Sequence, residues 1–143
     1  MAGYDTNRGN ASRAREETKP LPVFLLKQIT PELFSDTAKE CAQVIADNGG
    51  RDKNKSTQLR RFYDEICLWQ EKVGSDETRF ADNLPFIRMI AAKVAYANGR
   101  KLVDNSFLEF MEKGLKQVDS LKTFKTFKTF MEAFMGFYKQ IKG

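Results

Sequence analysis

The spacing of apolar residues along the chain predicts α-helices and no sheet. From residue 23 onward, apolar side chains recur at steps of three and four positions, which brings them onto one face of a helix. No segment alternates apolar and polar residues between hairpin turns, as the strands of a sheet do. We therefore expect an all-α fold, a compact bundle of about five helices that forms a single domain over residues 23–143.

The expected helix ends are marked by capping residues, prolines and glycines. Thr30-Pro31-Glu32 has the form of a helix start, with a cap, a proline at the first helical position and a carboxylate in the first turn. That helix should end at Asn48-Gly49-Gly50. Pro85 is expected near the first position of a later helix. The other helices are predicted to run from Ser56 or Thr57 to Gly74, from about Asn83 to Asn98-Gly99, from Asp104 or Asn105 past Leu115, and from Ser120 nearly to the C-terminus.

Residues 1–22 lack this apolar periodicity. They are polar and carry Arg8, Arg13 and Arg15, so we expect a flexible basic arm ahead of the bundle. The same segment has no apolar stretch of the kind that a signal peptide needs, and no apolar run in the chain approaches the roughly 18 residues of a membrane helix. These features favour a cytoplasmic protein.

The last predicted helix contains Lys-Thr-Phe three times in succession over residues 122–130. Because steps of three drift around a helix, its phenylalanines should spread over a wide arc that needs more than one neighbouring helix to cover it. The lysines of the repeat, Lys122, Lys125 and Lys128, then occupy the other arc, and we interpret them as a solvated face.

The composition argues against an enzyme. The chain has no histidine, which removes the commonest general base and the commonest metal ligand. Its two cysteines, Cys41 and Cys67, form no CxxC pair, so we interpret them as buried small apolar side chains rather than a metal or redox site. No phosphate-binding, dinucleotide-binding or hydrolase motif is present. We expect no catalytic residue, no metal and no cofactor.

The positive net charge of the chain favours a polyanionic binding partner. The formal net charge is +5 at pH 7, and it is unevenly distributed. Residues 51–61 are basic with Asp52 as their only acid, residues 62–85 are mainly acidic, and residues 86–101 carry basic side chains and no acid. Two basic blocks therefore flank an acidic one.

The second basic block places a cationic and aromatic face on a helix. Met89, Lys93, Tyr96 and Arg100 fall within about 60° of one another at 100° per residue. A solvated helix side usually interleaves acids with its bases, and none is present between residues 83 and 103. Lysine and arginine can bind phosphates while a tyrosine stacks on a base or ribose, which suits a nucleic-acid backbone. The alternative is an ordinary solvated face.

The first basic block lies at the predicted start of the second helix. Lys55, Arg60 and Arg61 oppose the helix macrodipole there, and their placement can be incidental. A phosphate bound at this helix start would instead gain the free backbone N–H groups of Ser56 and Thr57 as well as the cationic side chains. We therefore keep these three residues as candidates for RNA binding.

Three segments resemble a known family. Residues 55–63, KSTQLRRFY, followed by residues 85–100, PFIRMIAAKVAYANGR, look like the small subunit of type III-A CRISPR effector complexes, the Csm complex. Residues 130–138, FMEAFMGFY, are similar to the closing helix of that family. The resemblance covers about residues 30–141 and leaves the N-terminal arm outside it.

The resemblance implies an all-helical, non-catalytic subunit that acts in antiviral defence and is present in several copies beside the backbone subunits that hold the CRISPR RNA. It would line the path of the target RNA. The matching polar residues are Gln58 and Arg60 in the first motif and Lys93, Tyr96 and Arg100 in the second. Implied partners are the CRISPR RNA, the target RNA, further copies of the chain, and the other Csm subunits, including the large polymerase-like subunit. Cleavage chemistry would belong to those other subunits.

Two alternative hypotheses about the function of the chain remain open. In the first, the chain is a structural homodimeric adaptor that acts through protein contacts without touching RNA. Its contacts would come from Leu68, on the polar side of the second helix, and from the phenylalanine-rich last helix. In the second and weaker reading, the chain is a DNA-binding regulator, but no helix-turn-helix with a base-reading helix is evident.

Overall fold

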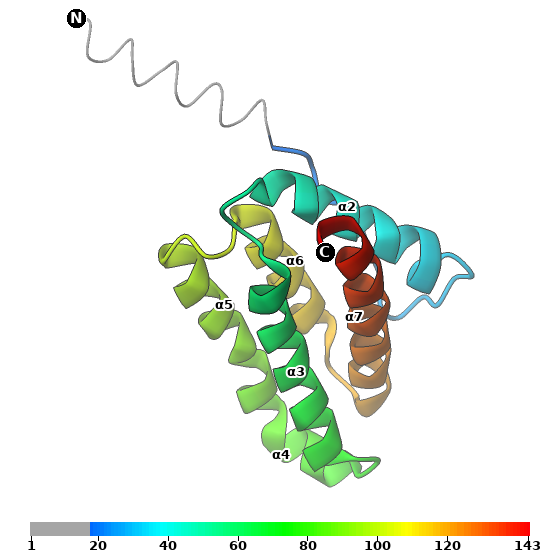
Figure 1. Cartoon of the computed structure of the whole chain (residues 1–143). Coiled ribbons are helices and arrows are strands. Elements are labelled where there is room, and N and C mark those ends of the chain that lie inside the picture. Colours follow the sequence, from blue (N-terminus) through cyan, green and yellow to red (C-terminus); the bar gives the residue numbers. More distant parts are fainter. Residues whose placement is uncertain (1–17) are drawn as a thin grey trace, which may run out of the picture.

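The computed structural model describes residues 18–143, and all regular structure within them is helical (Figure 1). The predicted all-α bundle is confirmed. Residues 1–17, most of the predicted N-terminal arm, lie outside the described residues. A short π-helical turn, η1, spans Leu33–Thr37, and it is followed by α2 over Ala38–Gly49, α3 over Ser56–Val73, α4 over Glu77–Arg88, α5 over Ile90–Gly99, α6 over Asn105–Gln117 and α7 over Leu121–Lys142.

The first helical segment starts differently from the prediction. The residue before η1 is Glu32 rather than Thr30, and no side chain caps it. The N–H of Thr37 donates to the carbonyl of Glu32 at 3.0 Å, five residues back, so the first turn is wider than an α-turn. The predicted end is confirmed, because α2 stops at Gly49 and Gly50 has a φ of 59°.

The predicted helix over residues 83–99 is two helices. α4 begins well before Pro85, at Glu77, because the carboxylate of Asp76 accepts hydrogen bonds from the N–H groups of Thr78 and Arg79 at 2.9 and 3.1 Å. The expectation that Pro85 stands near a helix start is therefore wrong. It lies inside α4, where its missing N–H removes one backbone hydrogen bond, and the helix breaks one turn later at Met89.

The other predicted starts are confirmed. α3 begins at Ser56 and ends before Gly74, whose φ is 60°. The Asp104 carboxylate caps α6 by accepting from the N–H of Phe107 at 3.1 Å. Ser120 caps α7 in a reciprocal arrangement with Thr123. Apart from the start of α3, which no side chain caps, each of these helix starts and ends is set by a capping residue or a glycine at that position in the sequence.

The core is organised around α7, which packs against α2 and α3 along its length (Figure 1). Its phenylalanines are covered by several elements, as the repeat predicts: Phe124 lies against Phe80 of α4, and Phe130 against Phe110 of α6, with ring centroids 5.9 and 6.0 Å apart. Phe124, Phe127, Phe130 and Phe134 are all fully buried. They serve this chain's own core, so these four residues do not provide the partner contacts that the adaptor alternative would need from the last helix.

The segment ahead of η1 is attached to the bundle. Phe24 stacks on Phe130 with ring centroids 4.8 Å apart. The side-chain amide of Gln117 accepts from the N–H of Leu26 at 2.8 Å and donates to the carbonyl of Phe24 at 3.0 Å. Lys19, within the predicted arm, is ion-paired with Asp47 of α2 at 2.6 Å, and this pairing lowers the pKa of the Asp47 carboxyl.

The two cysteines differ in their surroundings. Cys41 is fully buried, as expected, and burial raises the pKa of its thiol to about 12. Cys67 is only partly buried, so for this residue the expectation is only partly met. Over residues 18–143, no group of three or more acidic or sulfur ligands is placed to hold a metal ion, and no helix there has the length and apolar character to cross a membrane.

A buried polar cluster joins the ends of three helices. Asn54 is completely buried in the loop between α2 and α3 and has a φ of 58°. Its side-chain amide donates to the carbonyl of Ile45 at 2.9 Å and to the Asp104 carboxylate at 2.7 Å, and its Oδ1 accepts from the N–H of Asp104 at 2.9 Å. The hydroxyl of Tyr138 in α7 donates to the Asn54 carbonyl. One asparagine thus ties α2, α6 and α7 together.

Replacing Asn54 by alanine should lower the free energy of unfolding by about 3 kcal/mol. The variant loses three buried hydrogen bonds, leaves the Asp104 carboxylate short of a partner, and keeps a positive φ without the asparagine that tolerates it. Chemical denaturation followed by circular dichroism measures the change. Asn105→Ala is the matched control, because Asn105 is exposed, and its effect should stay below about 1 kcal/mol. Equal effects of the two variants would contradict the role given to Asn54.

Candidate nucleic-acid interface

The predicted cationic and aromatic face exists as an exposed strip along α4 and α5. Tyr96 is 67% exposed and Met89 48%, and Lys93 is also exposed between them. The Arg100 guanidinium, just past the end of α5, lies 5.9 Å from the centroid of the Tyr96 ring. Phe86 of α4, 50% exposed, continues the face three residues before Met89. We call Phe86, Met89, Lys93, Tyr96 and Arg100 the α5 strip.

The strip has an acidic neighbour that the local sequence does not reveal. Lys93 Nζ lies 2.7 Å from Oε2 of Glu65 on α3. The same oxygen accepts a hydrogen bond from Trp69 Nε1 at 3.3 Å. The absence of acids over residues 83–103 suggested an unpaired row of cations, and for Lys93 this is wrong, because tertiary packing supplies the acid from another helix.

The Glu65–Lys93 pair shows which part of α3 lies beside which part of α5. The two helices run in opposite directions side by side (Figure 1). At 100° per residue, Arg61 and Gln58 follow Glu65 along the same side of α3, toward its N-terminus. Because the helices are antiparallel, this direction leads toward the end of α5 that carries Tyr96 and Arg100. Four of the seven candidates, Gln58, Lys93, Tyr96 and Arg100, therefore border the seam between α3 and α5.

Arg60 faces another direction. Its Nε lies 3.6 Å from Oδ1 of Asp64, one turn along α3. Together they line a groove of about 690 Å³ between α3 and α7, to which Glu132, Met135 and Lys139 of α7 contribute. Arg61 lines the same groove from its outer edge. Arg60 is therefore separated from the α5 strip by the width of α3.

Lys55 stands at the N-terminal end of α3, which no side chain caps. It lines a hollow of about 360 Å³ with Arg51, Ser56, Thr57 and Lys142. Lys142 Nζ donates to the carbonyl of Gly50 at 2.5 Å, which brings the end of α7 to this loop. The sequence reading missed Lys139 and Lys142, because nothing local shows that the last turns of α7 return to the start of α3.

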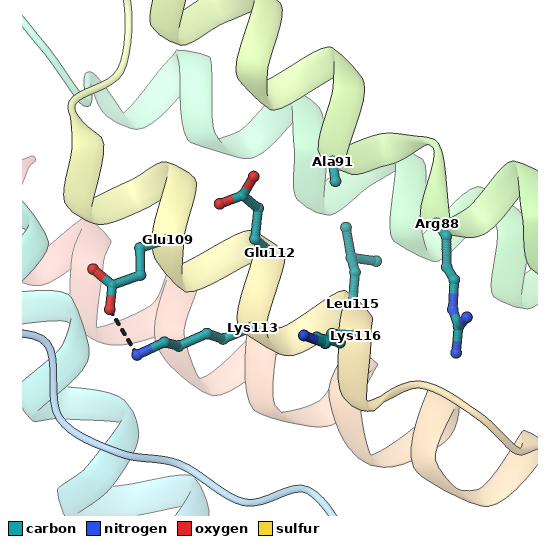
Figure 2. A pocket seen from close by; sticks show the side chains of 7 residues that line it. All are labelled: Arg88, Ala91, Glu109, Glu112, Lys113, Leu115 and Lys116. Atoms are coloured by element: carbon teal, nitrogen blue, oxygen red, sulfur yellow. Dashed lines mark ion pairs between the residues drawn. The ribbon is translucent and has the colours of Figure 1, made fainter.

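Two other surfaces, the lysine face of α7 and a hollow beside α6, are weaker candidates for binding RNA because their charges are partnered or mixed in sign. Lys128 pairs with Glu132 at 3.2 Å, and Lys125 donates to the Ser75 hydroxyl at 3.2 Å, as expected of a solvated face. A hollow of about 500 Å³ between α5 and α6 mixes both signs of charge (Figure 2). Figure 2 shows Glu109 paired with Lys113 at its rim, at 2.7 Å, while Arg88 lines the other end.

Comparison with known proteins gives a family. The model of the family described as Csm2 Type III-A matches residues 31–143, which includes all the helices described above. Searches of curated proteins and of solved structures returned no match. The matched region contains both motifs and the closing helix on which the resemblance rested. The chain therefore belongs to the Csm2 family, which provides the small subunit of type III-A CRISPR effector complexes.

Proposed function

We propose that this small subunit contacts the RNA of its complex through the seam between α3 and α5. The observation that carries the proposal is the α5 strip, where the exposed Tyr96 lies between Lys93 and Arg100 in the sequence and beside the Arg100 guanidinium. The two cations suit phosphates, and the tyrosine adds a stacking or packing surface. The protein reads no sequence here, because pairing with the guide does so.

Lys55, Arg60 and Arg61 form a second group of phosphate contacts in this proposal. The groove between α3 and α7 and the hollow at the start of α3 are both lined by cations, with Lys139 and Lys142 added from α7. Two acids, Asp64 and Glu132, also line that groove, as Glu65 accompanies the strip. We rank this group second because its aromatic residue, Tyr63, is partly buried, whereas Tyr96 of the strip is 67% exposed.

Membership of the Csm2 family supports the complex and the partners that we propose for this chain. The chain acts without catalysis in RNA-guided antiviral defence in the cytoplasm, beside the backbone and large subunits and further copies of itself. Its partners are the CRISPR RNA and the target RNA that pairs with it. Leu68, exposed on α3, keeps open the adaptor alternative, in which the chain works only through protein contacts.

Replacing Lys93 and Arg100 together by alanine should weaken binding of target RNA by the assembled complex. Two phosphate contacts per subunit are lost, so the slope of log K against log salt concentration should become shallower by about 1 to 2 for each copy that contacts the RNA. Filter binding across a salt series measures this, and circular dichroism should show unchanged helicity.

The matched control for that variant is Lys39→Ala with Lys116→Ala, which removes the same charge from exposed positions on α2 and α6. This control should leave the salt slope near that of the unmodified complex. If the double variant of the strip assembles normally and its affinity is unchanged across the series, the RNA role of the strip is wrong. If it binds RNA normally but fails to assemble, the adaptor alternative gains.

Replacing Glu65 by glutamine should act in the opposite direction. The amide oxygen can still accept from Trp69, but the partner charge of Lys93 is gone, so Lys93 no longer has to leave an ion pair in order to hold a phosphate. We expect severalfold tighter RNA binding with a salt slope close to that of the unmodified complex, because the number of phosphate contacts is the same. Glu40→Gln on α2 makes the same change far from the seam and should alter neither quantity. Weaker binding by Glu65→Gln would contradict the proposed use of Lys93.

A further inference from the structure

An exposed aromatic pair extends the strip beyond its cations. Trp69 of α3, the only tryptophan of the chain, stacks on Phe86 of α4 with centroids 6.0 Å apart and ring planes within 9°. Trp69 is partly buried and Phe86 is half-exposed. Met89, directly after α4, is another large apolar side chain and is also about half exposed. Neighbouring apolar side chains left in solvent mark a binding surface more often than a defect.

Cations and hydrogen bonds surround this pair. Lys72 Nζ lies 4.7 Å from the centroid of the Trp69 ring. On its indole edge, Trp69 Nε1 donates to Glu65, whose carboxylate also holds Lys93. The indole is therefore held by both contacts, and Phe86 is stacked on a fixed support. A preorganised aromatic surface of this kind loses little entropy when a ligand stacks on it.

The order of side chains along the strip also suits a single strand. Phe86 of α4 and Tyr96 of α5 are both at least half exposed, and they lie on either side of the helix break at Met89. In the sequence, Lys93 lies between the two aromatic residues and Arg100 follows the second. Alternating aromatic and cationic side chains are the features that bind single-stranded nucleic acid, through bases and phosphates respectively.

We propose that Phe86, supported by Trp69, and Tyr96 stack on unpaired bases of an RNA strand, while Lys93 and Arg100 hold its phosphates. The inference rests on the proposed function and adds to it the class of RNA. A duplex keeps its base faces inside the helix, so stacking of this kind requires unpaired nucleotides. A protein partner would have use for the apolar side chains but less for the cations beside Trp69 and Tyr96.

The test uses the full chain at low salt and the fluorescence of Trp69 as a local reporter. Three probes of equal length are titrated: a single-stranded RNA of mixed sequence, an abasic ribose-phosphate strand, and an RNA duplex. Single-stranded RNA should change the Trp69 emission and bind about a hundredfold more tightly than the abasic strand, since each of the two stacked bases contributes about tenfold. Neither the abasic strand nor the duplex should change the emission to the same extent.

Variants at Phe86 separate stacking from general contact. Phe86→Ala and Phe86→Leu should both weaken binding of single-stranded RNA by about tenfold and leave binding of the abasic strand unchanged. Phe86→Leu keeps an apolar side chain at this surface position and so guards against a loss of folding. Leu68→Ala, at an equally exposed aliphatic residue one position from Trp69, is the control and should bind all probes normally.

The outcomes distinguish this inference from the proposed function. Equal affinity for the abasic strand and single-stranded RNA, no change in Trp69 emission at saturation, or normal RNA binding by Phe86→Leu overturns the stacking role even if the Lys93 and Arg100 variants still weaken binding. Loss of complex assembly by Phe86→Ala with unchanged RNA binding would instead identify the aromatic pair as a contact to another subunit, which also overturns it.

Discussion

The structure depends on burying the aromatic side chains of α7. Its phenylalanines follow one another at steps of three and four and point around a wide arc, so no single neighbour can cover them. Helices on several sides and the segment around Phe24 are needed, and α6 approaches so closely at Gly114 that a Cβ there would lie 2.4 Å from the Phe127 ring. Because α7 uses its apolar arc in this way, it has little left for partners.

The consequence is that the surface available for binding lies on the far side of the helices that cover α7. α3 and the α4–α5 pair turn their apolar residues inward and leave Trp69, Phe86 and Tyr96 at or near the surface. The break at Met89, one turn after Pro85, allows α4 and α5 to follow the surface of the bundle as separate helices. Apart from Arg100, just past the end of α5, the α5 strip is therefore carried by helices packed on the bundle rather than by loops.

Sequence reasoning predicted what is encoded locally. The caps at Asp104 and Ser120, and the exposed face with Lys93 and Tyr96, follow from residues close together in the chain. Features made by distant residues were not predicted: the Glu65–Lys93 pair and the meeting of the end of α7 with the start of α3 both depend on tertiary packing. Pro85 was misplaced because a proline inside a helix and one at its first turn look alike locally, and Asp76 supplied the earlier cap.

We propose that the α5 strip faces RNA in the assembled complex. To test this, a photoreactive benzoylphenylalanine is placed at position 96, the complex is assembled with labelled target RNA, and the cross-linked partner is identified after irradiation. We expect adducts between the small subunit and RNA from position 96, and none when the same group replaces Lys39 on α2. Adducts from position 96 that contain only other protein subunits would contradict it.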